Sequence, residues 1–245
     1  MSQYTVAFAG NPNTGKSTLF NLLTGMRQHT GNWAGKTVIS AEGEFTHKDH
    51  QYLAVDLPGT YSLYSNSADE EAARDYIIFE QPDVTLVVLD ATSLERNLNL
   101  ALQVLEITGR TVICINLIDE ARRLGIDINL KKISKRLGVP VVAISARNKI
   151  GIEALLDQVE RVATSVVAAP PLRITYNDEI ERGIAELTPM VEQTIGSMYP
   201  ARWIALRLLD GDDSLLTSLK TNMNSKGTTL SGTKEVLGHG VTACH

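Results

Sequence analysis

The chain has 245 residues, of which 43% are hydrophobic and 21% charged, and its formal net charge is −5. This composition is that of a globular protein and excludes a chain that is disordered throughout, and the acidic balance argues against a protein that coats nucleic acid. The apolar runs are far shorter than the roughly 18–20 residues needed to cross a bilayer, and the start lacks a secretion signal, so we expect a soluble chain.

Short apolar runs alternate with segments of helical periodicity in the first part of the chain. The runs predict strands over Tyr4–Ala9, Gln51–Val55, Val84–Leu89, Thr111–Ile115 and Val139–Ile144. The periodic segments predict helices over Ser17–Thr24, Ala68–Phe79, Asn97–Thr108, Leu130–Leu137 and Ile152–Ala163. Because buried strands that alternate with helices form parallel sheets covered on both faces, the predicted fold class is α/β with a mostly parallel sheet. Residues Val38–Thr46 predict an added edge strand, antiparallel to Gln51–Val55.

The pattern changes at Ala168-Ala169-Pro170-Pro171, which predicts a division into domains 1–168 and 169–245. Beyond this point apolar residues recur at helical spacing, from Ile180 to Ile195 and again from Trp203 to Leu209. The segment Thr221–Thr233 is rich in Asn, Ser, Thr and Gly, and we expect it to be loosely ordered. The second domain is therefore predicted to be small and all-α, with a disordered C-terminal part.

A glycine-rich motif follows the first predicted strand and opens the first predicted helix. The segment Gly10-Asn-Pro-Asn-Thr-Gly-Lys-Ser17 satisfies the phosphate-loop pattern G-x-x-x-x-G-K-[ST]. Its glycines let backbone N–H groups turn towards phosphate oxygens, and the start of the helix adds positive potential. We expect Lys16 to reach the β- and γ-phosphates and the Ser17 hydroxyl to bind Mg²⁺. In this place the motif predicts a P-loop NTPase fold of the small-GTPase kind.

The segment Asn116-Leu117-Ile118-Asp119 follows a predicted strand and indicates which base is bound. A carboxylate at Asp119 can accept hydrogen bonds from both N1–H and the 2-amino group of guanine, a donor pair that adenine lacks. We expect Asn116 to hold the loops together and to contact the purine. The segment Ser145-Ala146-Arg147 is expected to supply a backbone N–H to the guanine O6. The pattern predicts GTP and GDP rather than ATP.

Two further segments are expected to respond to the γ-phosphate. In Asp56-Leu-Pro-Gly59, Asp56 can hold Mg²⁺ through water and the Gly59 N–H can sense the phosphate. Thr37, in the segment Gly31–Thr37, stands where a threonine closes on Mg²⁺ when GTP is bound. Many small GTPases orient the attacking water with a Gln, but the two residues after Gly59 are Thr and Tyr. We therefore expect slow hydrolysis and assign no residue to orienting the water.

Together with more specific segments, these motifs make the chain resemble the cytosolic N-terminal region of the FeoB family, the ferrous iron transport protein B of bacteria. The segments that carry the resemblance are Gly10–Ser17, Gly31–Thr37, Asp56–Ser62, Arg74–Tyr76 and Asp90–Asn97. The resemblance covers nearly the whole first domain, and the helical pattern after Pro171 resembles the family's dissociation-inhibitor-like helical domain. The chain departs from the family pattern at Ala34, where many members have Pro.

The resemblance implies a GTP-hydrolysing switch that regulates Fe²⁺ uptake through an adjoining polytopic membrane domain that this chain does not contain. It also implies activation by K⁺, bound by Asn13 and by the backbone carbonyls of Gly31 and Trp33. This cation would supply the charge that an arginine finger gives to other GTPases. The implied location is the cytoplasmic face of the bacterial inner membrane.

Two alternatives stay open at this point. A soluble GTPase of the ribosome-assembly or tRNA-modification type shares the P-loop and much of the fold, but the segment after Pro171 has nine acidic and seven basic residues and no recognisable RNA motif. A nucleotide-binding interaction protein that hardly hydrolyses GTP also fits the missing Gln. No nucleic acid partner is expected, and a homo-oligomer is left open.

The candidate site gathers residues from five segments. Those expected to contact the nucleotide, Mg²⁺ or K⁺ are Gly10, Asn11, Pro12, Asn13, Thr14, Gly15, Lys16, Ser17, Thr18, Gly31, Trp33, Thr37, Asp56, Gly59, Asn116, Leu117, Asp119, Ser145, Ala146 and Arg147. Those expected to act in hydrolysis are Asn13, Lys16, Thr37 and Gly59, while the expected Mg²⁺ ligands are Ser17, Thr37 and Asp56. The histidines show no ligand set, so His47 and His50 are interpreted as turn residues and no iron site is predicted.

Overall fold

The computed structural model describes residues 2–25, 28–32, 39–64, 67–166, 170, 172–196 and 199–225. The chain divides into two compact units, Met1–Leu172 and Arg173–His245. The boundary predicted after residue 168 stays a prediction, because residues 167–169 lie outside the described part. Among the described residues, no helix has the length and apolar character that a membrane span requires.

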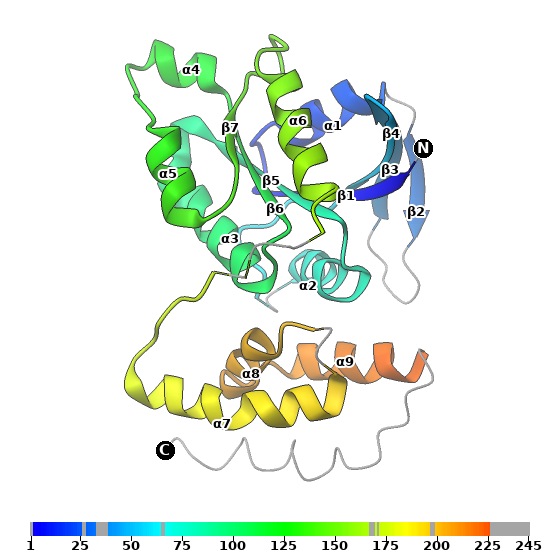
Figure 1. Cartoon of the computed structure of the whole chain (residues 1–245), viewed down its shortest axis with the longest axis vertical. Helices are drawn as coiled ribbons and strands as arrows, with labels where there is room; N and C mark the ends of the chain where they lie inside the picture. Colours follow the sequence, from blue (N-terminus) through cyan, green and yellow to red (C-terminus); the bar gives the residue numbers. More distant parts are fainter. Residues whose placement is uncertain are drawn as a thin grey trace. The chain divides into compact units, whose positions relative to one another are not determined.

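Within the described part of the first unit, seven strands form one sheet with the order β2-β3-β4-β1-β5-β6-β7 (Figure 1). The strands are β1 (Gln3–Gly10), β2 (Gln28–Asn32), β3 (Ile39–His47), β4 (His50–Asp56), β5 (Val84–Asp90), β6 (Thr111–Asn116) and β7 (Val141–Ala143). β1 pairs in parallel with β4 and β5, and β6 and β7 continue in parallel, whereas β2 and β3 are antiparallel to their neighbours. The loops after β1, β4, β6 and β7 therefore leave from one edge of the sheet, where ligands bind in α/β folds.

Helices alternate with the parallel strands as the sequence predicts. They are α1 (Lys16–Thr24), α2 (Ala68–Asp75), α3 (Leu94–Ile107), α4 (Ile118–Arg123), α5 (Leu130–Leu137) and α6 (Ile152–Ala163), with a π-helical turn at Tyr76–Glu80 and a 3₁₀ turn at Ala91–Ser93. Local chemistry marks their ends: the Asn129 side chain accepts from the Lys132 N–H at the start of α5, and Gly138 ends it in a left-handed conformation.

The core of this unit lies on both faces of the sheet. On one face α1 and α6 pack over the same buried cluster (Figure 1), in which Phe20 of α1 meets Phe8 of β1 edge to face at 5.5 Å. Leu155 and Val159 of α6 are buried in that cluster. Alternate buried strand residues such as Val87 point to the opposite face, where α3 packs against β1, β5 and β6. The α/β fold with helices on both faces is confirmed.

The predicted elements are confirmed with a few corrections. All five core strands and the antiparallel edge strand form, and α5 and α6 have their predicted bounds. The sequence does not predict β2, because Gln-His-Thr-Gly-Asn contains no apolar residue; an edge strand can form through backbone pairing alone. The helix predicted over Ala68–Phe79 changes into a π-helical turn at Tyr76. The six-residue helix α4 is too short to show a periodic pattern.

The second unit is helical within its described residues, with α7 (Asp178–Ile195), α8 (Ala201–Leu209) and α9 (Asp213–Ser225). Its buried side chains include Ile184, Val191, Trp203, Ile204, Leu206, Leu215, Leu219 and Met223. The prediction that Thr221–Thr233 is loosely ordered is wrong for residues 221–225, which continue α9. The physical reason is that Leu219 and Met223, four residues apart, carry on the apolar face of the helix. Residues 226–233 lie outside the described part.

A charged network fixes the start of α7 to α8. The Arg202 guanidinium donates to both oxygens of Glu181, at 2.7 and 3.1 Å, and to the Ile174 carbonyl at 2.9 Å. The Tyr176 N–H also donates to Glu181, at 3.0 Å. These contacts, with Arg202 as the largest contributor, lower the pKa of Glu181 from 4.5 to about 2.

We expect the change Glu181→Gln to destabilise the helical unit at neutral pH and to lose this effect in acid. Because the carboxyl has a lowered pKa in the folded state, its contribution is complete above pH 4.5 and disappears as the pH falls to about 2. Urea denaturation followed by Trp203 fluorescence in a Trp33→Phe background tests this. Glu186→Gln, an exposed change on the same helix, is the control; equal midpoints for both variants at pH 7 would contradict the prediction.

Candidate functional site

The P-loop joins the end of β1 to the start of α1 in the conformation that its glycines permit. Gly15 has φ 79°, and a Cβ there would lie 2.3 Å from Asn116 Nδ2. A Cβ on Gly10 would lie 2.6 Å from the Val88 carbonyl oxygen. Only glycine fits these two close approaches. Asn13 is exposed and also has a positive φ, of 67°.

Three of the predicted phosphate and Mg²⁺ residues, Lys16, Ser17 and Asp56, meet at the carboxyl ends of β1 and β4. The buried Lys16 ammonium donates to Asp56 Oδ1 and, at 2.6 Å, to the Leu57 carbonyl. The Ser17 hydroxyl lies 3.4 Å from Asp56 Oδ2. A hydroxyl and a carboxylate are oxygen donors of the kind that Mg²⁺ prefers, so Ser17 and Asp56 fit this ion.

The segment that follows Asp56 lies against the P-loop. The Leu57 N–H donates to the Phe8 carbonyl at 3.0 Å, and the Thr60 N–H donates to the Gly10 carbonyl at 3.2 Å. Gly59 is exposed between these contacts, and a Cβ there would lie 3.5 Å from Pro12. Gly59 therefore lies at the surface beside the P-loop.

Two side chains that the sequence does not single out hold this segment further along. Gln103 of α3 accepts from the Leu63 N–H at 2.6 Å, and Glu70 of α2 accepts from the Ser62 hydroxyl at 2.8 Å. Only the fold brings Gln103 to residue 63, forty positions away. These contacts anchor residues 62 and 63 to α2 and α3.

At the other end of the site, Asn116 joins three loops. Its Nδ2 donates to the Thr14 carbonyl of the P-loop at 2.9 Å, and its Oδ1 accepts from the Ala146 N–H at 3.0 Å. The side chain is almost completely buried. Asn116 therefore links its own loop to the P-loop and to the loop at Ala146, while its contact with the purine stays a prediction. The Ala146 N–H is engaged by this bond, so the donor to the guanine O6 stays a prediction.

Asp119 keeps one carboxylate oxygen without a hydrogen-bond partner of normal geometry. Its Oδ2 accepts from Asn148 Nδ2 at 2.9 Å, whereas Oδ1 is buried and has no hydrogen-bond partner among the described residues. Ser145 contributes most to lowering the pKa of Asp119, followed by the backbone N–H groups of Asp119 and Glu120 and by the Asn148 amide, and the carboxyl stays ionised. A buried unpaired acceptor is costly, and the N1–H and 2-amino groups of guanine would satisfy it. Asn148 is a further residue that the sequence does not indicate.

The remaining predicted residues divide into three groups. Pro12, Thr18 and Arg147 are exposed around the site, and Asn11 is buried in the P-loop. Leu117 stands in a left-handed conformation, φ 61°, directly before α4. Gly31 is part of β2, where it pairs with Ser40, and Trp33 and Thr37 lie outside the described residues.

Comparison with known proteins identifies relatives of both units. The family described as "Ferrous iron transport protein B" matches residues 4–159, and the "FeoB cytosolic helical domain" family matches residues 176–237. The Fe(2+) transporter FeoB of Methanocaldococcus jannaschii is 45% identical over 213 residues, which cover 86% of this chain and 31% of that relative. The chain thus spans about a third of the length of this curated relative.

Solved structures of similar proteins agree with the fold. The cytosolic domain of the T. maritima FeoB iron transporter in GDP form I has a TM-score of 0.81 and 34% identity, covering 90% of this chain and 85% of that one. The same domain in its GMPPNP form has a TM-score of 0.78 and 34% identity, covering 89% and 86%.

Proposed function

The chain belongs to the ferrous iron transport protein B (FeoB) family, and from this premise we propose that it binds GTP and hydrolyses it slowly as a molecular switch. The observation that carries the proposal is the buried, unpaired Oδ1 of Asp119, in a loop that Asn116 ties to the P-loop. Guanine offers two donors, one for Oδ1 and one that would replace Asn148 at Oδ2. The GDP and GMPPNP forms of the T. maritima relative support guanine nucleotides as the ligands.

The phosphate chemistry is assigned to the residues around Lys16. Its ammonium, now paired with Asp56 and the Leu57 carbonyl, would move to the β- and γ-phosphates and neutralise their charge. Ser17, Asp56 and Thr37 would hold Mg²⁺, which when bound stabilises the charge that develops on the phosphates. The Gly59 N–H would respond to the γ-phosphate, while the Thr60–Gly10 hydrogen bond keeps its segment beside the P-loop.

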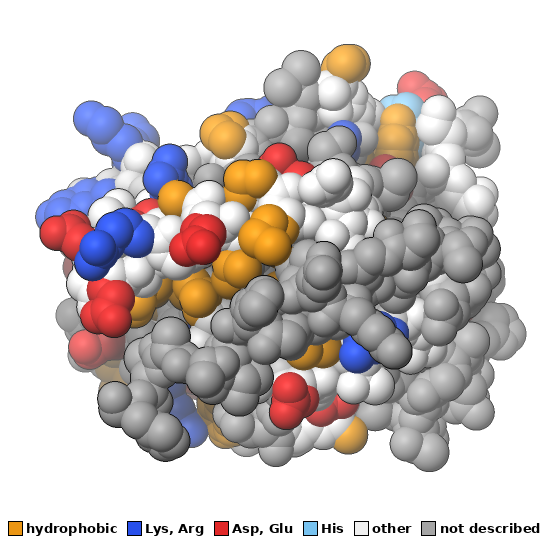
Figure 2. Space-filling model, turned by 90° about the horizontal axis from the view of Figure 1, so that it is seen from below, with side chains coloured by type: hydrophobic (Ala, Val, Ile, Leu, Met, Phe, Trp, Pro, Cys, Tyr) orange, Lys and Arg blue, Asp and Glu red, His pale blue; other side chains and the backbone are white. Residues whose placement is uncertain are grey.

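The switch is proposed to regulate Fe²⁺ uptake through an adjoining polytopic membrane domain, with this chain at the cytoplasmic face of the bacterial inner membrane. The support is the family itself, whose curated member matched above is an Fe(2+) transporter about three times longer than the matched region. The ribosome-assembly or tRNA-modification alternative loses its support, because the second unit matches the family's helical domain. On the face shown in Figure 2, described acidic and basic side chains are interspersed, which nucleic acid binding does not favour.

We expect hydrolysis to increase at least about tenfold when Na⁺ is replaced by K⁺, since a positive charge beside the transferred phosphoryl group is worth several orders of magnitude in GTPases. Asn13, exposed on the P-loop, is the proposed K⁺ ligand together with the carbonyls of Gly31 and Trp33. Asn13→Ala should therefore abolish the gain. Phosphate release at saturating GTP in matched KCl and NaCl buffers measures the effect.

Binding of a fluorescent GDP analogue by Asn13→Ala is the control, because it shows that the loop still folds. Equal hydrolysis rates of the unaltered chain in both salts would overturn the K⁺ assignment. Hydrolysis no faster than the uncatalysed reaction in either salt, with normal GTP binding, would instead favour an interaction protein that does not turn over GTP.

A further inference from the structure

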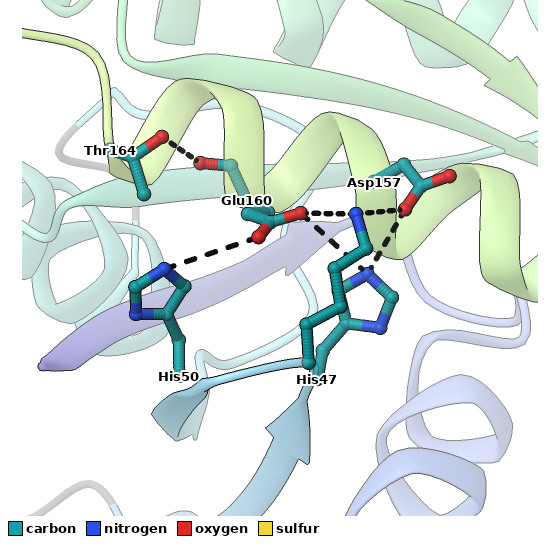
Figure 3. A network of polar contacts seen from close by, with 6 residues as sticks. His47, His50, Asp157, Glu160 and Thr164 are labelled. Atoms are coloured by element: carbon teal, nitrogen blue, oxygen red, sulfur yellow. Dashed lines mark hydrogen bonds and ion pairs between the residues drawn. The ribbon is translucent and has the colours of Figure 1, made fainter. Parts of the chain in front are cut away.

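A cluster of titratable side chains lies at the end of the first unit opposite the P-loop. His47 ends β3 and its imidazole faces Asp157 and Glu160 of α6, whereas His50 begins β4 and its imidazole faces Glu160 (Figure 3). β4 runs from His50 to Asp56, so at about 3.3 Å per residue the cluster lies about 20 Å from the Mg²⁺ residues. His47 and His50 flank the turn at residues 48–49, as expected of turn residues, and the fold also brings them to two carboxylates more than 100 positions away in the sequence.

The ligand-type atoms of this cluster are close together. His47 Nε2 lies 3.1 Å from Asp157 Oδ1 and 3.9 Å from Glu160 Oε2, and His50 Nε2 lies 4.0 Å from Glu160 Oε1. One ligand atom each from His47, Asp157 and Glu160 can be chosen so that all lie within 4.8 Å of one another. In a tetrahedral site with metal–ligand bonds of about 2.0–2.1 Å, ligand atoms lie about 3.3–3.5 Å apart. The observed separations need only small side-chain adjustments to reach this geometry.

A cation already occupies the position between the two carboxylates. The Lys48 ammonium lies 2.8 Å from Asp157 Oδ1 and 2.6 Å from Glu160 Oε2. Its side chain is 53% exposed, whereas that of His47 is only 11% exposed. Lys48 can therefore swing into solvent, while the imidazole is held in place by packing.

We propose that His47, Asp157 and Glu160 form a binding site for a divalent first-row transition metal, which displaces the Lys48 ammonium from the two carboxylates. Mixed imidazole and carboxylate ligands suit Zn²⁺, Fe²⁺ and Co²⁺ rather than Mg²⁺ or Ca²⁺. The fourth position is open to His50 or to water. Such a metal would tie the β3–β4 hairpin to α6. The proposal does not depend on GTP binding or hydrolysis.

The test uses the full chain carrying His239→Ala, Cys244→Ser and His245→Ala, so that none of these C-terminal residues can supply a ligand. Mg²⁺ and GDP are present in excess to keep the nucleotide site filled. Titration with Co²⁺, followed by its visible ligand-field absorbance, reports nitrogen and oxygen ligation directly, and equilibrium dialysis with Zn²⁺ gives the stoichiometry. We expect one metal per chain, and a Zn²⁺-dependent increase in Tm.

The variants separate a metal site from a simple ion-pair network. His47→Ala and Asp157→Asn should each weaken binding at least about tenfold, because each removes a direct ligand. Glu153→Gln, at an exposed position of the same helix, should leave the affinity unchanged. Lys48→Met should tighten binding about tenfold or more, because the metal no longer has to displace the ammonium. GDP binding checks that each variant is folded.

An affinity of Lys48→Met that is unchanged or weaker would overturn the proposal even if the other variants failed to fold. Metal binding by His47→Ala that equals that of the background chain would overturn it as well, because the metal would then sit elsewhere. A background chain that binds neither Co²⁺ nor Zn²⁺ would show that the cluster is only an ion-pair network.

Discussion

Replacing Asp119 with Ala should lower the affinity for GDP at least about a hundredfold while leaving the weak affinity for ADP nearly unchanged. Hydrogen bonds to a charged group contribute about 1.5–3 kcal/mol each, and about 1.4 kcal/mol corresponds to a factor of ten in affinity. Guanine would make two such bonds, one of them in place of the Asn148–Asp119 bond present in this structure. The lower end of the range is therefore the expected loss. Competition of GDP and ADP against a fluorescent GDP analogue measures both affinities.

Asp119→Asn is the matched control for this experiment. An amide at this position keeps one acceptor and gains a donor, so it should favour xanthine, whose 2-position carries a carbonyl in place of the amino group. The variant should bind xanthosine diphosphate better than GDP. A ratio of GDP to ADP affinity that stays the same in Asp119→Ala would contradict the assignment of Asp119 to the base and, with it, the proposed preference for guanine.

The second large effect is expected from Gly15→Ala. The added Cβ would lie 2.3 Å from Asn116 Nδ2, which donates to the Thr14 carbonyl. The same change imposes a left-handed conformation on a residue with a side chain, at a cost of about 1–2 kcal/mol. The clash breaks the contact between the P-loop and Asn116. We therefore expect GDP affinity to fall at least about a hundredfold, because hydrogen bonds to a charged group contribute about 1.5–3 kcal/mol each and the displaced loop would lose such bonds to the phosphates.

Gly25→Ala separates the effect of backbone strain from the effect of the clash with Asn116. Gly25 also has a positive φ, of 64°, but a Cβ there meets nothing within 4 Å. This variant should show the backbone strain, about 1–2 kcal/mol in urea denaturation, with unchanged GDP binding. Gly15→Ala should lose more stability and also lose binding. Normal GDP affinity in Gly15→Ala would mean that the P-loop does not depend on its contact with Asn116.

The sequence predicts the P-loop, the guanine motif and most helices and strands, because each of them depends on residues that are adjacent in the chain. Gly15 and Lys16 owe their roles to the turn between one strand and one helix, so spacing alone reveals them. The edge strand β2 escapes prediction, because backbone pairing with β3 holds a segment that has no apolar pattern.

The sequence does not predict which side chains from distant segments come into contact. Nothing in the sequence around Asn148 indicates that its amide donates to Asp119. Likewise, nothing around Gln103 indicates that its side chain accepts a hydrogen bond from the Leu63 N–H. His47 likewise reaches Asp157 only through the packing of α6 on the sheet. One-dimensional periodicity carries no information on which of many polar side chains will meet in this way.

The side-chain amide of Asn116 donates through Nδ2 to the loop at Thr14 and accepts through Oδ1 from the loop at Ala146. The surface that would meet the purine and the surface that would meet the phosphates are therefore linked through one side chain. A nucleotide that arrives by its base finds the phosphate loop already in place, so little conformational entropy remains to be lost when the phosphates bind. Conversely, thermal opening of either loop loosens the other, and release of the nucleotide would proceed as one cooperative event.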